Sequence, residues 1–297
     1  MSLSRAYFSR ANRRGLLRTG AALSAAAAAS AGLVMPASAL AQSSGDSLLN
    51  RVLDRGTVLI GTGSTNPPWH FEDENGELVG MDIEMGRILA QALFEDRNKV
   101  EFVVQAADAR IPNLASDKVD ITIQFMSVTR DRAQLVAFTI PYYREAVTLM
   151  FPADSPYNSI ADVQGKGITV SVLQNVYAED LVHRGVPDAV VSQLDSNANT
   201  ILAIDSGRAD ASLADYSTGR WYAAQFPDKY KFAPDPWGTH SYAAAVKQGD
   251  PTWLGFVNTV FHSAMTGLDF DAYRVPFETY FGDSLELPSA GFPTELS

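Results

Sequence analysis

The sequence of 297 residues contains no cysteine, which excludes disulfides, thiolate metal sites and a cysteine nucleophile. It has few histidines, and they show no spacing typical of metal ligands: His70, His183, His240 and His262. The Gly-x-Ser-x-Gly elbow of many hydrolases is absent, and residues 61–63 (Gly-Thr-Gly) lack the third glycine of a dinucleotide-binding loop. We therefore expect neither a metal nor a cofactor.

Positive charge is scarce beyond residue 41. Residues 1–41 hold five arginines and no acidic residue, so the remainder carries 18 Lys and Arg against 34 Asp and Glu. Such a chain repels phosphate, and we expect no nucleic-acid partner. Hydrophobic residues make up 46% and charged residues 19%, which indicates a globular protein. After residue 41 no apolar run approaches the roughly 18 residues of a membrane span.

Residues 1–41 have the features of an export signal. An arginine-rich start precedes an alanine-rich run at 25–29 and two small-residue cleavage sites, which end at Ala39 and Ala41. Residues 12–18 (Asn-Arg-Arg-Gly-Leu-Leu-Arg) resemble the twin-arginine consensus, with asparagine where serine or threonine is usual. We expect a cleaved signal that engages the twin-arginine translocase and a mature chain in the periplasm; ordinary Sec export and an uncleaved anchor are the alternatives.

Short apolar segments alternate with helical periodicity, which predicts an α/β protein. The first series begins with a strand at 57–62 and a hairpin at 72–79, and Asp82 is expected to cap the next helix. Further strands are predicted at 100–104 and 119–123, with a short helix at 108–116. The alternation restarts after residue 166, with strands at 167–173, 189–192 and 209–213 and helices at 177–184, 196–206 and 216–226.

Two extended runs, 139–151 and 241–246, are long enough to cross between two lobes, and apolar helices follow at 251–266 and 269–281. We predict a two-lobed fold of the periplasmic-binding-protein type, in which two α/β lobes are joined by two hinge-crossing segments. Residues 42–143 with 243–285 form lobe 1, residues 144–242 form lobe 2, and 286–297 are a tail. The space between the lobes is the default ligand site.

Five segments, in this order and spacing, resemble family 3 of the bacterial extracellular solute-binding proteins, the polar amino-acid receptors of ABC importers. They are residues 67–69 (PPW), 80–85 (GMDIEM), 127–132 (SVTRDR), 141–143 (PYY) and 206–211 (SGRADA). The resemblance runs from about Leu53 to Gly282. It implies a binding protein, which we expect to be a monomer, that captures an amino acid and delivers it to the membrane permease of the transporter.

The resemblance also implies roles for particular residues. Arg132 matches the arginine that binds the ligand α-carboxylate, for which a planar guanidinium supplies two parallel donors. Ser127 matches a hydroxyl that binds the same carboxylate, and Phe125 a position whose backbone contacts the ligand. Asp215 matches the acid that accepts the ligand ammonium group. Trp69 is a further candidate. Without the family register, Arg132 would be a solvated helix charge and Asp215 a helix N-cap.

Other positions depart from the family pattern. The loop that usually reads Gly-Ser/Thr-Thr is residues 175–177 here, so Asn175 and Tyr177 are candidate contacts, helped by backbone N–H groups at a helix N-terminus. Asn66 replaces the aromatic residue that covers the ligand side chain. Gly63 and Ala107 also lack bulk, which is expected to leave room around the ligand.

Arg110 resembles an arginine that members specific for acidic amino acids place against the distal carboxylate; a surface charge is the alternative. We expect a polar or acidic amino acid to be favoured and lysine and arginine to bind poorly, because no first-lobe acid is available for a cationic side chain. The competing function is an enzyme on the same fold, such as a cyclohexadienyl or prephenate-type dehydratase. It would need a placed acid or base, for which His70, Glu145 and Glu179 are the nearest candidates.

Overall fold

The computed structural model describes residues 47–289 of the chain. The export signal predicted for residues 1–41 lies outside the described residues, and so do residues 290–297 of the predicted tail. No helix within 47–289 is both long and apolar enough to cross a membrane.

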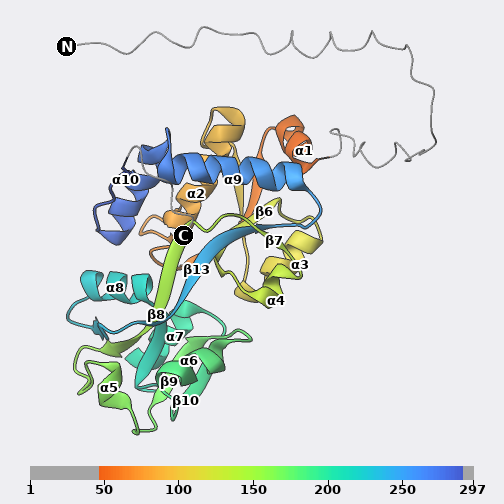
Figure 1. Cartoon of the computed structure of the whole chain (residues 1–297). Helices are drawn as coiled ribbons and strands as arrows, with labels where there is room; N and C mark the ends of the chain where they lie inside the picture. The colour runs from red at the N-terminus through yellow and green to blue at the C-terminus, as the bar shows by residue number, and fades with distance from the viewer. Residues whose placement is uncertain (1–46, 290–297) are drawn as a thin grey trace, which may run out of the picture. The chain divides into compact units, whose positions relative to one another are not determined.

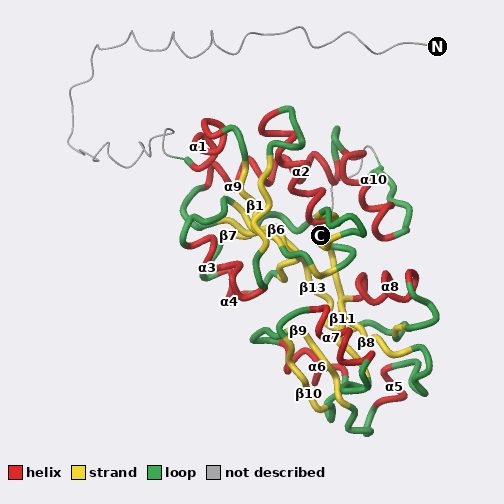
Figure 2. Tube along the Cα trace, turned by 180° about the vertical axis from the view of Figure 1, so that it is seen from behind, coloured by secondary structure: helices red, strands yellow, loops and turns green. Residues whose placement is uncertain are grey.

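A single mixed sheet runs through both halves of the described chain. Its main strands follow the order β10-β9-β11-β8-β13-β6-β1-β5. The two central strands, β8 (Tyr143–Pro152) and β13 (Trp237–Val246), are long, pair antiparallel and connect the two halves (Figures 1 and 2). On one side of them lie β10 (Val190–Leu194), β9 (Thr169–Leu173) and β11 (Ala211–Asp215), and on the other β6 (Ile121–Ser127), β1 (Val58–Thr62) and β5 (Val100–Val104).

Lobe 1 surrounds the half of the sheet that contains β1, β5 and β6. Its helices are α1 (Leu48–Arg55), α2 (Met81–Phe94), the 3₁₀ turn η2 (Ala107–Ala109), α3 (Arg110–Ala115), α4 (Arg130–Ala133), α9 (Pro251–Thr266) and α10 (Phe270–Phe281). Short strands complete it: β2 (Thr65–Asn66), β3 (His70–Glu72), β4 (Leu78–Val79) and β7 (Ala137–Phe138). The core joins sheet residues such as Ile60 and Ile121 to Met85 of α2 and Phe261 of α9.

Lobe 2 surrounds the half that contains β9, β10 and β11. Its other elements are α5 (Ile160–Val163), α6 (Ala178–Gly185), α7 (Asn197–Asp205), α8 (Tyr216–Gln225) and β12 (Tyr230–Phe232). Successive strand residues point to opposite faces of a sheet. Accordingly Leu149 packs with Val182 of α6, whereas its neighbour Met150 packs with Ile204 of α7. The two lobes therefore have separate hydrophobic cores.

Most predicted elements are present near their expected limits, and both predicted crossing runs contain a crossing strand. Two features differ. Helix α2 is capped at Gly80, whose φ of 121° favours glycine, so the expectation that Asp82 caps this helix is wrong. Strand β6 extends to Ser127 because Ser127 pairs with Tyr242 of β13, a contact between residues far apart in the sequence. This extension carries the chain directly into the region between the lobes.

Candidate ligand-binding site

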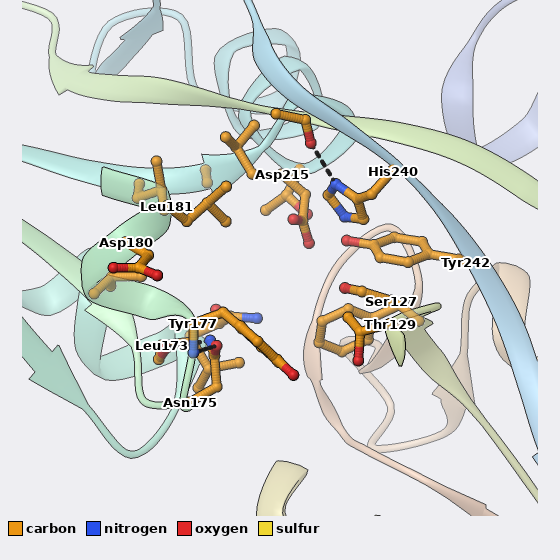
Figure 3. A pocket seen from close by; sticks show the side chains of 18 of the residues that line it. Ser127, Thr129, Leu173, Asn175, Tyr177, Asp180, Leu181, Asp215, His240 and Tyr242 are labelled. Carbon is orange, nitrogen blue, oxygen red and sulfur yellow. Dashed lines mark hydrogen bonds between the residues drawn. The ribbon is translucent and has the colours of Figure 1, made fainter. Parts of the chain in front are cut away.

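A cavity of about 520 Å³ lies at the ends of β6, β9 and β11, where residues of both lobes meet. Seven of the nine predicted site residues line it: Arg110, Phe125, Ser127, Arg132, Asn175, Tyr177 and Asp215. Figure 3 shows Tyr177 and Asn175 on one wall facing Ser127 and Thr129 on the other, with Asp215 between Leu181 and His240.

Trp69 and Asn66 were also predicted to contact the ligand, but they do not line this cavity. The Trp69 indole is fully buried among aromatic rings, 4.7 Å from Tyr143 and 5.2 Å from Tyr242 between ring centroids. Its Nε1 donates to Ser217 Oγ of lobe 2 at 2.9 Å. Asn66 lies on β2, where it pairs with His70, and is 1% exposed. Trp69 therefore connects the lobes beside the cavity.

Arg132 reaches the cavity from the first turn after β6. The Thr129 hydroxyl caps α4 by accepting from the Arg132 backbone N–H, and Arg132 Nη1 donates to the Ser127 carbonyl at 3.0 Å. Burial lowers the pKa of Arg132 from its ordinary value, and no acidic side chain within residues 47–289 forms an ion pair with it. The guanidinium is therefore partly desolvated without a counter-charge, which is unfavourable until an anion arrives.

Arg110 is a second guanidinium on the cavity wall and is 6% exposed. Its Nε donates to the Ala107 carbonyl at 2.7 Å, Nη1 donates to the Gln124 carbonyl at 3.1 Å, and the group lies 5.7 Å from the Phe125 ring centroid. Burial and repulsion from Arg132 lower the pKa of Arg110 to about 10. The surface-charge alternative for Arg110 is excluded by this burial.

Asp215 supplies a negative charge from lobe 2. It ends β11 and occupies the N-cap position of α8, but its side chain makes no capping hydrogen bond. Burial raises the pKa of Asp215, while His240 and a hydrogen bond from Tyr242 act in the opposite direction. The Tyr242 hydroxyl points towards this carboxylate in Figure 3. The cavity wall thus combines two partly or fully buried cations from lobe 1 with a partly buried anion from lobe 2. The other charged residues that line it are exposed: Arg130, Asp131, Asp180 and Arg184. Asp131 shows that the lining does include a first-lobe acid.

Tyr177 and Asn175 form the wall opposite Arg132. The Asn175 side chain accepts from the Tyr177 backbone N–H at 2.9 Å and donates to the Leu173 carbonyl at 3.0 Å, which fixes the loop before α6. The Tyr177 ring centroid lies 5.9 Å from the Arg132 guanidinium carbon, and its hydroxyl donates to Asp131 Oδ2 of lobe 1 at 2.5 Å. This residue therefore covers the guanidinium and contacts the opposite lobe.

Sequence reasoning missed the buried carboxylate that supports the lobe-1 wall. Asp82 Oδ2 accepts from the Phe125 backbone N–H at 3.0 Å and contacts His70 Nδ1 at 2.8 Å, while Oδ1 accepts from the Tyr142 hydroxyl at 2.7 Å. Phe125 has a φ of 34°, a left-handed conformation that costs about 1–3 kcal/mol for a non-glycine residue. Asp82 holds this residue in place on the cavity wall. In the sequence, the one sign that Asp82 would be buried is its position among the apolar residues of the predicted helix.

The room expected at Gly63 is already filled. A Cβ atom placed there would lie 2.6 Å from His70 Cδ2 and 3.0 Å from Gln124 Nε2. The His70 ring also stacks on Phe125, with 4.7 Å between centroids. Neither Gly63 nor Ala107 lines the cavity, so the missing bulk at these positions does not enlarge it.

The three acid–base candidates of the enzyme alternative lie outside the cavity lining. His70 is buried against Asp82, and Glu179 is exposed on α6. Glu145 is buried on β8, where Ser217 Oγ donates to it at 2.5 Å. Burial and the nearby charge of Asp215 raise the pKa of Glu145 to about 8. Within residues 47–289, no group of three or more His, Asp or Glu side chains is arranged to hold a metal ion.

Asp82→Ala should lower the free energy of unfolding by roughly 3 kcal/mol or more, because three buried donors lose their acceptor at about 1–3 kcal/mol each. Urea denaturation followed by circular dichroism measures this change. Asp228→Ala, at an exposed position, is the control and should change stability by less than about 0.5 kcal/mol. Equal stability of the two variants would contradict the supporting role of Asp82.

Comparisons with known proteins agree with this geometry. The family model described as bacterial extracellular solute-binding proteins, family 3, matches residues 58–275. A glutamine-binding protein of Geobacillus stearothermophilus is 27% identical over 211 residues, which cover 67% of this chain and 78% of that protein.

Two solved structures are similar in fold and sequence. The P235GK mutant of ArgBP from T. maritima is 28% identical, with a TM-score of 0.69, covering 79% of this chain and 99% of that one. The ancestral amino acid-binding protein AncCDT-1, a precursor of cyclohexadienyl dehydratase, is 28% identical with a TM-score of 0.70, covering 78% and 99%. The predicted two-lobed fold and family resemblance are confirmed. This chain belongs to family 3 of the bacterial extracellular solute-binding proteins.

Proposed function

We propose that the protein binds an L-amino acid between its lobes, as a periplasmic monomer, and delivers it to the membrane permease of an ABC transporter. The observation that carries this proposal is that Arg132 and Asp215 line the same cavity from opposite lobes. An α-carboxylate satisfies the first group and an α-ammonium the second, so one zwitterion neutralises two desolvated charges. The relatives support the same function, since one is a glutamine-binding protein and another a probable amino-acid ABC transporter-binding protein.

We further propose that the ligand side chain is polar or acidic. Arg110 presents a second buried guanidinium to the cavity, and a cationic side chain beside it would be repelled. Ser212 and Thr218 also line the cavity, and their buried hydroxyls have no hydrogen-bond partner within residues 47–289, so a polar ligand that reaches them would satisfy them. ArgBP from T. maritima, a structural neighbour, has an arginine-bound form, which makes arginine the decisive competitor.

A thermal-shift panel of the twenty amino acids should show the largest stabilisation with glutamine, glutamate or another small polar amino acid, because ligand binding to the folded state raises its stability. Size-exclusion chromatography with light scattering on the same preparation checks the monomer. A largest shift with arginine or lysine that persists in Arg110→Gln would disprove the proposed side-chain preference.

Arg132→Ala and Asp215→Asn should each weaken the strongest binder of the panel at least about tenfold, because each removes a charge-assisted hydrogen bond worth about 1.5–3 kcal/mol. Arg132→Lys should restore only part of the affinity, since an ammonium cannot supply two parallel donors. Titration calorimetry measures these affinities. Arg51→Ala, at an exposed position of α1, and Asp228→Asn are matched controls. Wild-type affinity in Arg132→Ala or Asp215→Asn would refute the assigned site.

The enzyme alternative rests on the AncCDT-1 neighbour, a precursor of cyclohexadienyl dehydratase. None of its three predicted acid–base candidates lines the cavity. Of the acids that do, Asp131 and Asp180 are exposed, and burial raises the pKa of Asp215. Binding therefore remains the function that the geometry supports best. Incubation of prephenate with the purified protein separates the two functions, because consumption of prephenate would favour the enzyme.

We also propose export by the twin-arginine route, supported by Arg13-Arg14 followed by Leu16-Leu17 and by the membership of an extracellular family. The double substitution Arg13→Lys with Arg14→Lys should leave uncleaved precursor in the cytoplasm, because the translocase recognises the arginine pair. Immunoblotting of cell fractions measures this. Arg5→Lys with Arg10→Lys is the control, and normal periplasmic accumulation of the first double variant would indicate Sec export instead.

A further inference from the structure

A second buried carboxylate lies beside the cavity without lining it. Glu145 of β8 is 2% exposed. Its Oε1 accepts from the backbone N–H groups of Ala146 at 2.8 Å and Ser217 at 3.4 Å, and its Oε2 accepts from Ser217 Oγ at 2.5 Å. All of these donors are neutral. The carboxylate is therefore hydrogen-bonded but has no opposite charge to balance it.

The strand register places Glu145 next to Asp215. In the antiparallel pair of β11 and β8, Asp215 is opposite Val147, and Glu145 is two residues from Val147 on the same face of β8. Diagonal neighbours of this kind are close enough for long side chains to interact. No Lys or Arg within residues 47–289 forms an ion pair with either carboxylate.

The other charged and titratable groups around the two carboxylates belong to β13, β8 and lobe 1. His240 of β13 is the cross-strand partner of Glu145, and the Nδ1 atom of His240 is hydrogen-bonded to the Gly238 carbonyl at 2.8 Å. The other groups that interact electrostatically with one or both carboxylates are Tyr143 of β8, Tyr242 of β13, and His70 and Arg110 of lobe 1. None of these groups ion-pairs with either acid, and His240, Tyr242, His70 and Arg110 offset only part of the effect of burial on the pKa of Asp215.

Two adjacent buried carboxylates do not both ionise readily, and they titrate as a pair. Burial raises the pKa of both groups, and the charge of Asp215 contributes to the elevation at Glu145, whose pKa rises to about 8. Both effects favour a protonated carboxyl group in the pair while the cavity is empty. A cation placed at Asp215 would offset the repulsion and favour ionisation of both acids.

We propose that Glu145 and Asp215 share one proton while the cavity is empty, and that the ammonium group of a bound amino acid displaces it into solvent. This inference rests on the proposed amino-acid site and assigns Glu145 as a positioning residue that couples ligand uptake to proton release. The sign follows from linkage: since the bound state holds fewer protons, affinity rises with pH until the empty pair is fully ionised, by up to about tenfold per pH unit.

Proton release would also affect the contact between the lobes. Ser217 Oγ donates to Glu145 and accepts from Trp69 Nε1 of lobe 1. A hydrogen bond to an ionised carboxylate is stronger than one to a neutral carboxylic acid. Ionisation of Glu145 would thus strengthen the series of hydrogen bonds that connects Trp69 through Ser217 to Glu145 of β8 when the ligand is present.

Calorimetric titration at pH 7 in phosphate and in Tris tests the coupling, because these buffers absorb protons with different heats. L-glutamine is the first probe, replaced by the strongest amino acid of the thermal-shift panel if glutamine does not bind. The wild type and the control Glu101→Gln, at an exposed position of β5, should give different binding heats in the two buffers. Glu145→Gln should give equal heats and an affinity that changes less than about twofold between pH 6.5 and 7.5.

His240→Asn distinguishes the second possible proton source. If this variant loses the buffer dependence while Glu145→Gln keeps it, the proton comes from His240 and the proposal is wrong. Equal heats in the two buffers for the wild type, despite tight binding, would overturn the coupling and leave the amino-acid site intact.

Carbon-13 NMR of carboxyl-labelled glutamate tests the shared proton without any ligand. One glutamate signal should titrate several pH units above the others, be absent in Glu145→Gln, and move to lower pH in Asp215→Asn because the neighbouring charge is gone. Titration of Glu145 together with the exposed glutamates would refute the shared proton. If no amino acid of the panel binds, the proposed function fails and the coupling falls with it, even if the raised titration is observed.

Discussion

The antiparallel pairing of β8 with β13 is the constraint on which the site depends. These strands make one continuous sheet out of two lobes that have separate cores. Their register also sets Glu145 opposite His240 and Tyr143 opposite Tyr242. Asp215 of β11 is opposite Val147 of β8 and therefore lies on the same face of the sheet as these residues. A slip of one residue would turn these side chains to the other face of the sheet. The hinge and the chemistry of the cavity are therefore fixed by the same hydrogen bonds.

On either side of β8 and β13, partly or fully buried charged groups without an ion-pair partner among residues 47–289 line the cavity, positive groups from lobe 1 and a negative group from lobe 2. Arg110 and Arg132 belong to lobe 1, whereas Asp215 belongs to lobe 2, and all three are at least partly desolvated in the cavity wall. Desolvated charges are unfavourable unless they are paired. A zwitterion pairs with both lobes at once, so its binding energy is available only while the lobes face each other. The same distribution supports the proposed amino-acid ligand over a simple anion or cation.

Local sequence patterns predicted the strands and the crossing runs, whereas the family resemblance supplied Arg132 and Asp215, two residues of opposite charge that line the cavity. The local patterns failed where the answer depends on partners distant in sequence. Asp82 has the local context of a helix cap, yet its bonds to Phe125 and Tyr142 place it in the core. The space at Gly63 was predicted as open because the sequence could not show that His70 folds back into it.

Besides the pairing of β13 with β6 and β8, polar side-chain contacts join the two lobes around the cavity. Trp69 donates to Ser217 on the hinge side, Tyr177 donates to Asp131 across the cavity, and Arg220 pairs with Asp283 at the surface. Hydrogen bonds of this kind contribute about 1 kcal/mol each, and an exposed ion pair about 0–1 kcal/mol. In the proposed function, a ligand bridging Arg132 and Asp215 would add charge-assisted hydrogen bonds of about 1.5–3 kcal/mol each between the lobes, which is comparable with these contacts. The proposed ligand would therefore contribute at least as much to holding the lobes together around the cavity as these polar side-chain contacts do.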